Sequence, residues 1–216
     1  MKSEKQHILK QIIPAIFAVA IHFLTYYLPK CLYHGSYVTI STALDRAIPF
    51  YPLFVVFYVG AYVQWGMYWF RLAIDKTDRR YGYISSEALS KLICAVTFLL
   101  LPITMTRPQI TGTDLFSRAL AVIYRSDTPV CLFPSIHCLQ SWFCFRYNLE
   151  SSRPKWFKVF SALFSLGVFA STVLVKQHLA ADILGGIVLA ELSLRVFRRT
   201  SLPKRFAAQM DRLFSR

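Results

Sequence analysis

Six apolar stretches alternate with polar or basic segments along the chain. They cover residues 12–28, 50–70, 89–103, 135–147, 156–175 and 179–197. A helix of about 20 mostly apolar residues crosses the roughly 30 Å of membrane hydrocarbon, and proline or glycine is tolerated inside such a helix. Several of the stretches approach this length, and the fourth is the shortest and most polar. The pattern therefore predicts an all-α fold, a bundle of six transmembrane helices.

The composition is that of a membrane protein rather than a soluble one. Of the 216 residues, 55% are hydrophobic and 17% are charged, which is too apolar for an ordinary soluble surface. No small-residue cleavage site follows the first apolar stretch, so we expect this stretch to remain as a helix. The sequence shows no repeats, low-complexity linkers or shifts of composition. We therefore expect residues 1–216 to form a single membrane domain.

The positive charges are distributed asymmetrically about the predicted membrane. The formal net charge is +14, and cytoplasmic loops of membrane proteins collect lysine and arginine. If the N-terminus is cytoplasmic, 19 basic residues fall on that side: Lys2, Lys5, Lys10, Arg71, Lys76, Arg79, Arg80, Lys91, Arg146, Arg153, Lys155, Lys158, Arg195, Arg198, Arg199, Lys204, Arg205, Arg212 and Arg216. Six fall on the other side: Lys30, Arg46, Arg107, Arg118, Arg125 and Lys176. Both termini are therefore predicted to be cytoplasmic, and the basic C-terminal tail is expected to bind anionic lipid rather than nucleic acid.

The five cysteines form no metal-binding pattern, since the sequence contains no CxxC pair. Cys94, Cys138 and Cys144 fall in or near the predicted spans and are expected to pack there. Cys31 and Cys131 both fall on the predicted outer side, where a disulfide and two unpaired thiols are the alternatives.

Polar side chains gather at the outer ends of the third to sixth predicted spans. A charged group inside hydrocarbon costs about 2.5–3.5 kcal/mol on insertion scales, so such groups usually line a cavity or a site. Four segments supply the candidates, which are Arg107, Ser135, His137, Lys176, His178 and Asp182. Their grouping at one depth predicts a functional site at the outer face.

The chemistry of these residue types points to phosphoryl transfer. His178 and Asp182 are four residues apart, so on a helix they would share one face. The carboxylate would fix the imidazole tautomer and leave the other ring nitrogen free to attack an electrophile or take a proton. Ser135 is a favoured helix N-cap, and the helix start behind it offers N–H groups that attract phosphate. Arg107 or Lys176 could clamp the same oxygens.

Each candidate has a simpler interpretation when it is taken alone. Asp182 could be a proton or ion relay, and Lys176 could be an interfacial anchor. Arg107–Pro108 could form a surface turn, and Ser135 could be only a helix cap. His7 and His22 are assigned no role, and nothing around His34 on the outer side forms a motif. The aromatic stretch YVQWGMYWF of the second span is interpreted as lipid-facing and interfacial packing. The combination of candidates at one depth favours a catalytic site.

These residues resemble the type 2 phosphatidic acid phosphatase family, which also includes sphingomyelin and inositol phosphorylceramide synthases. The family has three motifs: Lys, six residues, Arg-Pro; then Pro-Ser-x-His; then Ser-Arg, five residues, His, three residues, Asp. The sequence matches them with Arg107-Pro108, with Pro134-Ser135-Ile136-His137, and with Ser171, His178 and Asp182. The match runs over about residues 107–182, and six spans fit the rest.

The resemblance implies roles for the matched residues. His178 would be the nucleophile, Asp182 would orient it, and His137 would protonate the leaving oxygen. The first step would give a phosphohistidine, after which His137 would act as the base on water. Arg107 and the backbone at Ser135 would stabilise the charge on the transferring group. The resemblance implies no metal or other cofactor.

Two cationic positions of the family motifs are missing. Leu100 stands where the first motif has lysine, and Thr172 stands where the third has arginine. Lys176 is the expected replacement as a phosphate ligand, and Arg118 and Arg125 are weaker alternatives. These changes affect the expected substrate more than the expected chemistry.

The sequence therefore predicts a multi-pass cell-membrane phosphatase whose active site faces the extracytoplasmic side. Its substrate would be a lipid phosphate monoester or an isoprenyl diphosphate, and its partners would be the lipid bilayer and this lipid. One alternative is a phosphotransferase that passes the head group to an alcohol instead of water. Another is a proton-coupled transporter, although the ionisable groups fall near one interface and transporter sites lie near the midplane. Nothing in the sequence specifies an oligomeric state.

Overall fold

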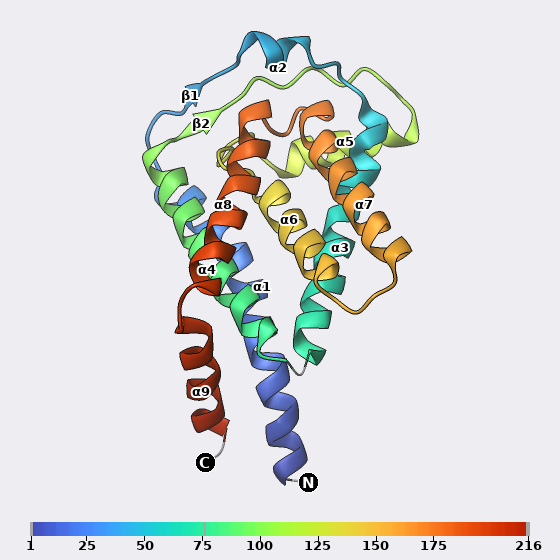
Figure 1. Cartoon of the computed structure of the whole chain (residues 1–216). Coiled ribbons are helices and arrows are strands. Elements are labelled where there is room, and N and C mark those ends of the chain that lie inside the picture. Colours follow the sequence, from blue (N-terminus) through green and yellow to red (C-terminus); the bar gives the residue numbers. More distant parts are fainter. Residues whose placement is uncertain (1, 76, 215–216) are drawn as a thin grey trace.

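The computed structural model describes residues 2–75 and 77–214. The chain is mostly helical, and its helices are, in order, α1 Lys2–Leu32, α2 Ala43–Ala47, the short 3-10 helix η1 Pro52–Phe54, α3 Val55–Ile74, α4 Arg79–Leu100, α5 Leu115–Ser126, α6 Ile136–Leu149, α7 Lys155–Leu174, α8 Ala180–Arg198 and α9 Leu202–Phe214. The two-residue strands β1 (Val38–Thr39) and β2 (Ile103–Thr104) pair in parallel. Figure 1 shows both termini at one end of the helical bundle. Two of the basic residues counted above, Lys76 and Arg216, lie outside the described residues.

Each of the six predicted apolar stretches corresponds to a helix: α1, α3, α4, α6, α7 and α8. Among the described residues, four segments are long and apolar enough to cross a membrane: Ile12–Leu32, Pro52–Ile74, Arg79–Leu100 and Lys155–Leu174. α6 has 14 residues, fewer than the roughly 20 that span the hydrocarbon. The structure thus indicates a helical, multi-pass membrane protein with four candidate spans. Passage of α6 and α8 through the membrane stays a prediction.

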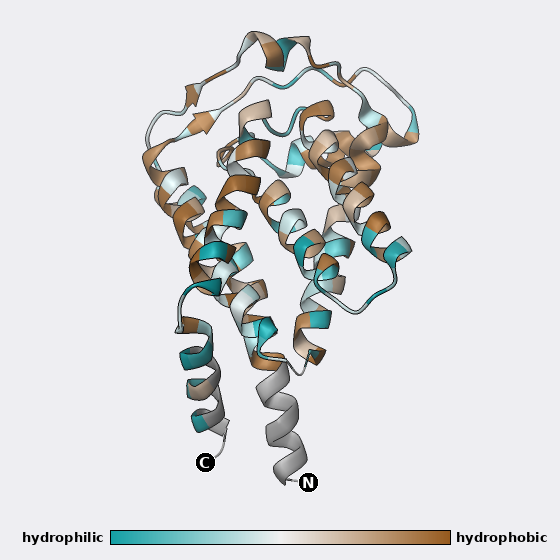
Figure 2. Cartoon of the chain, in the orientation of Figure 1, coloured by the Kyte–Doolittle hydropathy of each residue, from teal (hydrophilic) through white to brown (hydrophobic). Residues whose placement is uncertain are grey.

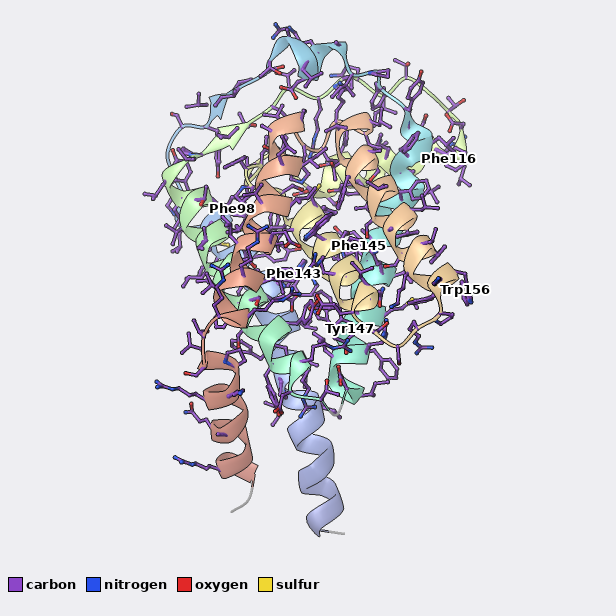
Figure 3. All side chains as sticks on the ribbon, viewed as in Figure 1. Phe98, Phe116, Phe143, Phe145, Tyr147 and Trp156 are labelled. Atoms are coloured by element: carbon purple, nitrogen blue, oxygen red, sulfur yellow. The ribbon has the colours of Figure 1, made fainter. Side chains whose placement is uncertain are left out.

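The centre of the bundle is α6, which packs against α3, α4, α7 and α8. Its side chains Phe143 and Tyr147 are buried, whereas Trp156 at the start of α7 is 69% exposed; all three are labelled in Figure 3. Large apolar side chains also cover the outer surfaces of α1, α3, α4 and α7. The brown parts of the ribbons of α4 and α7 in Figure 2 mark hydrophobic residues of these helices. Since soluble proteins rarely expose apolar patches of this extent, the exterior suits contact with lipid.

Two long connections cross the end of the bundle opposite the termini, and together they form the cap (Figure 1). The cap consists of residues 33–54, which include β1 and α2, and residues 101–114, which include β2. α2 begins with a capping box, in which the Thr42 and Asp45 side chains each accept a hydrogen bond from the other residue's backbone N–H. This box satisfies backbone groups of a helix that is too short to be stable alone.

α5 is an element that the apolar pattern did not predict. Asp114 caps its start by accepting hydrogen bonds from the N–H groups of Phe116 and Ser117. Leu120 is fully buried, whereas Val122 is 63% exposed, so one face of the helix packs against the bundle. A helix of 12 residues with a single apolar face leaves no long hydrophobic run in the sequence.

α4 carries an ion pair inside the bundle. Lys91 Nζ lies 3.3 Å from Glu87 Oε1, and both side chains are fully buried. Gln140 Nε2 of α6 donates to the same oxygen at 2.5 Å. Lys91 was counted among the basic residues of the cytoplasmic side, but it is fully buried in the middle of α4, which begins at Arg79. Removing this residue leaves 18 basic residues against six, so the charge asymmetry remains.

All five cysteines are free thiols in the structure. Cys31 is exposed and Cys131 is buried, so the disulfide alternative is not realised. Cys94, Cys138 and Cys144 are buried, which confirms their predicted packing role.

Candidate active site

A cavity of about 280 Å³ lies between α1, α3, the end of α5 and the segments that precede α6 and α8. Arg107, His137 and His178 all line it, so three of the six predicted site residues meet in one space. Ser135 and Lys176 are not among its lining residues, and Asp182 reaches it through His178. A volume near the lower end of ligand pockets, about 300 Å³, suits a head group rather than a whole lipid.

The turn that ends α7 fixes the position of His178. Lys176 has a left-handed backbone conformation (φ 51°), which commonly closes a helix. The N–H groups of Gln177 and His178 then both donate to the Thr172 carbonyl oxygen at 2.9 Å. Because α8 begins only at Ala180, His178 lies in the loop before the helix. The expected helical pairing of His178 with the carboxylate four residues later therefore does not hold, although the contact itself forms.

The Nδ1 atom of His178 faces two hydrogen-bond acceptors. It lies 3.2 Å from Asp182 Oδ2 and 3.2 Å from the Leu132 carbonyl oxygen. Since a carboxylate and a carbonyl only accept hydrogen bonds, Nδ1 carries the proton of the neutral ring and Nε2 keeps its lone pair. Asp182 Oδ2 is itself held by the Leu179 N–H at 2.8 Å. This arrangement leaves His178 Nε2 able to act as a nucleophile.

His137 lies in the first turn of α6, against an aromatic wall formed by α3. Its ring stacks on Tyr58 with centroids 4.3 Å apart and lies 4.9 Å from the ring of Trp65. The His137 Nε2 atom is buried and has no hydrogen-bond partner within the described part of the chain. The aromatic wall therefore fixes the ring plane while Nε2 stays available to exchange a proton with a ligand.

The rings of His137 and His178 lie 5.8 Å apart, centroid to centroid. Both rings line the same cavity, so a phosphate group bound there can contact both imidazoles.

Arg107 is positioned by three neighbours. One guanidinium nitrogen donates to the Asp127 carbonyl oxygen at 2.6 Å, and the other donates to the side-chain oxygen of Gln177. The guanidinium also lies over the ring of Tyr124, 4.6 Å from its centroid. Gln177, which sequence reasoning missed, is the residue directly before His178, so this contact joins Arg107 to the loop that carries His178. Arg107 thereby offers a fixed positive charge at the cavity wall.

Ser135 caps α6 as predicted, since its Oγ accepts a hydrogen bond from the Cys138 N–H at 3.3 Å. Its own N–H donates to the Asp182 carbonyl oxygen at 3.1 Å. Gly186 permits this close approach of α8, because a Cβ atom there would lie 2.6 Å from the Ser135 carbonyl oxygen. In this arrangement the Ser135 N–H joins α6 to α8, and its role as a phosphate ligand stays a prediction.

The structure does not bring Lys176 into the cavity. Its ammonium donates to the carbonyl oxygens of Asp45 at 2.8 Å and Ile48 at 2.6 Å, both in the cap. These bonds hold the loop that carries His178 against the cap. Phosphate binding by Lys176 stays a prediction, and it would require the ammonium to leave both oxygens.

Sequence reasoning missed the aromatic wall and a third histidine. Tyr58, Tyr62 and Trp65 of α3 line the cavity, and so does His22 of α1, which had been assigned no role. The lipid-facing interpretation of the aromatic stretch fits Phe70, which is 64% exposed, but not Trp65, which is 1% exposed. The sequence did contain a signal for this wall. Tyr58, Tyr62 and Trp65 are spaced by four and three residues, which places them on one helix face.

Asp45 joins the cap to the start of α8. Its replacement should make the thermal stability of the protein change less as the pH falls. Its Oδ1 accepts from the Ala180 N–H at 2.8 Å, and its Oδ2 accepts from the Thr42 hydroxyl at 2.6 Å. Burial alone would raise the pKa of Asp45, but these hydrogen bonds and Lys176 together hold it below its ordinary value of 3.8. The stabilisation, on the order of 1–2 kcal/mol, is therefore complete above pH 3.8 and is lost as the pH falls through the lowered pKa.

The measurement is the thermal midpoint of the unmodified protein and of Asp45→Asn in detergent, followed from pH 7 downward. We expect the difference between the two midpoints to be constant near neutrality and to shrink below pH 3.8. A difference that stays constant through the acid range would contradict this role of Asp45.

Comparison with known proteins gives one family match. A model of the PAP2 superfamily matches residues 41–196. The matched range includes α2 of the cap, His137 and His178, and nearly all of α8. No curated protein matches the chain significantly.

Proposed function

Because the chain belongs to the PAP2 superfamily, we propose that it is a membrane lipid phosphatase that hydrolyses a lipid phosphate monoester or an isoprenyl diphosphate. Membership indicates a membrane phosphatase-like enzyme. It also confirms the family that the sequence resembles. The observation that carries the proposal is the meeting of two imidazoles in one cavity, with ring centroids 5.8 Å apart. The Nδ1 atom of one ring faces acceptors, and the Nε2 atom of the other has no partner among the described residues.

In the first step His178 Nε2 attacks the phosphorus atom. The bond between phosphorus and the leaving oxygen breaks, and His137 gives that oxygen a proton. Asp182 stabilises the positive charge that develops on the His178 ring, because its carboxylate lies 3.2 Å from Nδ1. The products of this step are a phosphohistidine and the lipid alcohol or, from a diphosphate, the lipid monophosphate.

In the second step His137, now without its proton, takes one from a water molecule. The water oxygen attacks the phosphorus atom, the bond to His178 Nε2 breaks, and inorganic phosphate leaves. Arg107 lies at the cavity wall throughout and stabilises the negative charge on the transferring group. Both rings then return to their starting protonation states.

The walls of the cavity support a lipid as the substrate. Phe23 and Tyr27 of α1 and Val59 and Tyr62 of α3 line the cavity, and each is between 46% and 55% exposed on the outside of the bundle. The cavity thus reaches the apolar exterior between these two helices. A phosphate head group can contact the histidines while its hydrocarbon chain stays in the membrane.

We assign the cavity to the extracytoplasmic side of the cell membrane. The cavity lies next to the cap, whereas both termini and α9 lie at the other end of the bundle (Figure 1). The excess of basic residues falls at the end with the termini, which is typical of cytoplasmic segments. α9 ends with the basic residue Arg212 in its last turn, which fits contact with anionic lipid on that side.

The decisive test is the product formed from labelled lipids. Purified protein would be incubated with phosphatidic acid, phosphatidylglycerol phosphate, a sphingolipid phosphate and undecaprenyl diphosphate, each labelled in the terminal phosphate. Release of free inorganic phosphate from at least one of them is expected. Transfer of the label to a new lipid would favour a phosphotransferase, and no product from any substrate would contradict the proposal.

A further inference from the structure

The cavity contains two strongly basic side chains, and one of them was not a candidate in the sequence. Leu100 points outward with 73% exposure and Thr172 is fully buried, so neither position supplies the charge that the family motifs have there. Lys176 is bonded to the cap. Among the described residues, the lysine and arginine side chains that line the cavity are Lys30 and Arg107.

Lys30 ends a continuous face of α1 along the cavity. Phe23, Tyr26, Tyr27 and Lys30 all line the cavity, and their spacing of three and four residues places them on one side of the helix. The apolar members Phe23 and Tyr27 are also exposed to the outside of the bundle. A ligand that lies along this face would meet hydrocarbon-like groups first and a cation in the last turn of the helix.

Lys30 is held more loosely than Arg107. Its ammonium lies 3.4 Å from Asp127 Oδ1 and 3.4 Å from the Tyr26 hydroxyl oxygen. The pair is partly exposed, with 28% and 31% of the two side chains accessible, and exposed ion pairs are worth about 0–1 kcal/mol. The Tyr26 O–H donates to the same Asp127 oxygen, so the carboxylate keeps a partner when the ammonium turns away. A phosphate oxygen can therefore displace this contact at small cost.

We propose that Lys30 is a specificity-determining residue that binds the lipid-attached phosphate of a lipid diphosphate. This inference rests on the proposed function and narrows its substrate class. The terminal phosphate reacts at His178, next to the fixed Arg107, and the second phosphate lies towards the lipid, along the face of α1. A lipid monophosphate has only the reacting phosphate and leaves Lys30 paired with Asp127.

The same contact assists the departure of the product. In the first step the bond between the terminal phosphorus and the bridging oxygen breaks, and its electron pair goes to that oxygen. His137 supplies the proton, the phosphorus is bonded to His178 Nε2, and a lipid monophosphate leaves. Lys30 stabilises the charge on this leaving phosphate, an effect that is absent when the leaving group is a lipid alcohol.

The experiment compares one lipid in two forms, with a diphosphate or a monophosphate head group. For Lys30→Gln, we expect kcat/KM for the diphosphate to fall by about 10- to 100-fold, because a charge-assisted hydrogen bond to the substrate is lost. We expect kcat/KM for the monophosphate to change by less than about threefold. The readout is thus the ratio of the two constants, which a general loss of folded protein would not alter.

Two variants serve as controls for the charge change. Lys30→Arg keeps a cation at the same place and should retain the preference for the diphosphate. Lys155→Gln makes the same chemical change at an exposed position at the start of α7 and should leave both constants unchanged. An unaltered ratio in folded Lys30→Gln would overturn the proposal while leaving the phosphatase function intact.

The unmodified protein gives a second measurement that does not depend on the folding of any variant. Inorganic diphosphate should inhibit hydrolysis of the lipid monophosphate about tenfold more strongly than inorganic phosphate does, because only the diphosphate reaches both cations. Equal inhibition by the two anions would count against Lys30 as a second phosphate site. Failure of the unmodified protein to release phosphate from either lipid would instead overturn the proposed function itself.

Discussion

Replacing His178 with alanine should abolish phosphate release, with kcat lower by ~10³-fold or more. In the proposed mechanism the imidazole Nε2 forms the bond to phosphorus, and alanine offers no replacement. Asp182 and Leu132 would lose only a donor, since both contacts run to His178 Nδ1. The measurement is release of labelled phosphate, together with the capture of label on the protein after rapid denaturation in base, where phosphohistidine is stable.

His34→Ala is the matched control for this prediction. His34 is exposed in the cap, so its replacement makes the same chemical change away from the cavity and should leave turnover unaltered. The folded state of both variants is checked by their thermal midpoints in detergent. A His178→Ala protein that is folded and still turns over at the normal rate would show that another group is the nucleophile.

His137→Asn should separate the two steps of the reaction. With a lipid phosphate we expect kcat to fall by about 10²–10⁴-fold, because neither the leaving oxygen nor the attacking water has its proton carrier. With a nitrophenyl phosphate the leaving phenolate is a weak base that needs no proton, so the first step should survive while hydrolysis of the intermediate stays slow. Phosphohistidine should therefore accumulate on His178.

Mass spectrometry of the intact protein after incubation with the aryl phosphate measures this accumulation. Unmodified protein should carry little phosphate at steady state, whereas the His137→Asn variant should carry close to one phosphate per chain. The double variant His137→Asn, His178→Ala should carry none, which assigns the modified residue. A His137→Asn protein that hydrolyses the aryl phosphate without accumulating label would mean that a different residue activates the water.

The sequence predicted the long helices well because their signal is local. Each apolar stretch reports the lipid-facing or buried faces of one helix, and six such stretches correspond to six helices. The ends of the helices depend on tertiary contacts instead. α4 extends back to Arg79 because Glu87 and Lys91 form an ion pair inside the bundle, and Gln140 donates a hydrogen bond to Glu87. A hydropathy pattern treats such charges as the end of a span. The cap and α5 were missed because they are short and held by tertiary contacts.

The candidate site was predictable to the extent that its chemistry lies in short motifs. Arg107, His137 and His178 line one cavity, and Asp182 contacts His178, as the motif spacing implied. Lys176 was chosen for its nearness in sequence to the nucleophile, but its left-handed backbone turns the side chain to the cap.

Lys30 could not be found in the same way. It precedes Arg107 by 77 residues, and its place in the cavity follows only from the packing of α1 against α3. Sequence distance gives no indication of such a contact, because the two helices are brought together by burial of their apolar faces.

The buried pair in α4 has a consequence for how the protein is made. Each charge alone costs about 2.5–3.5 kcal/mol at the bilayer centre, so an isolated α4 is a poor membrane helix despite its hydropathy. Its polar partner Gln140 is synthesised 49 residues after Lys91, so α4 is complete before that partner exists. We therefore expect the stable placement of this helix in lipid to depend on the arrival of α6, which would make biogenesis of the bundle cooperative across its first and second halves.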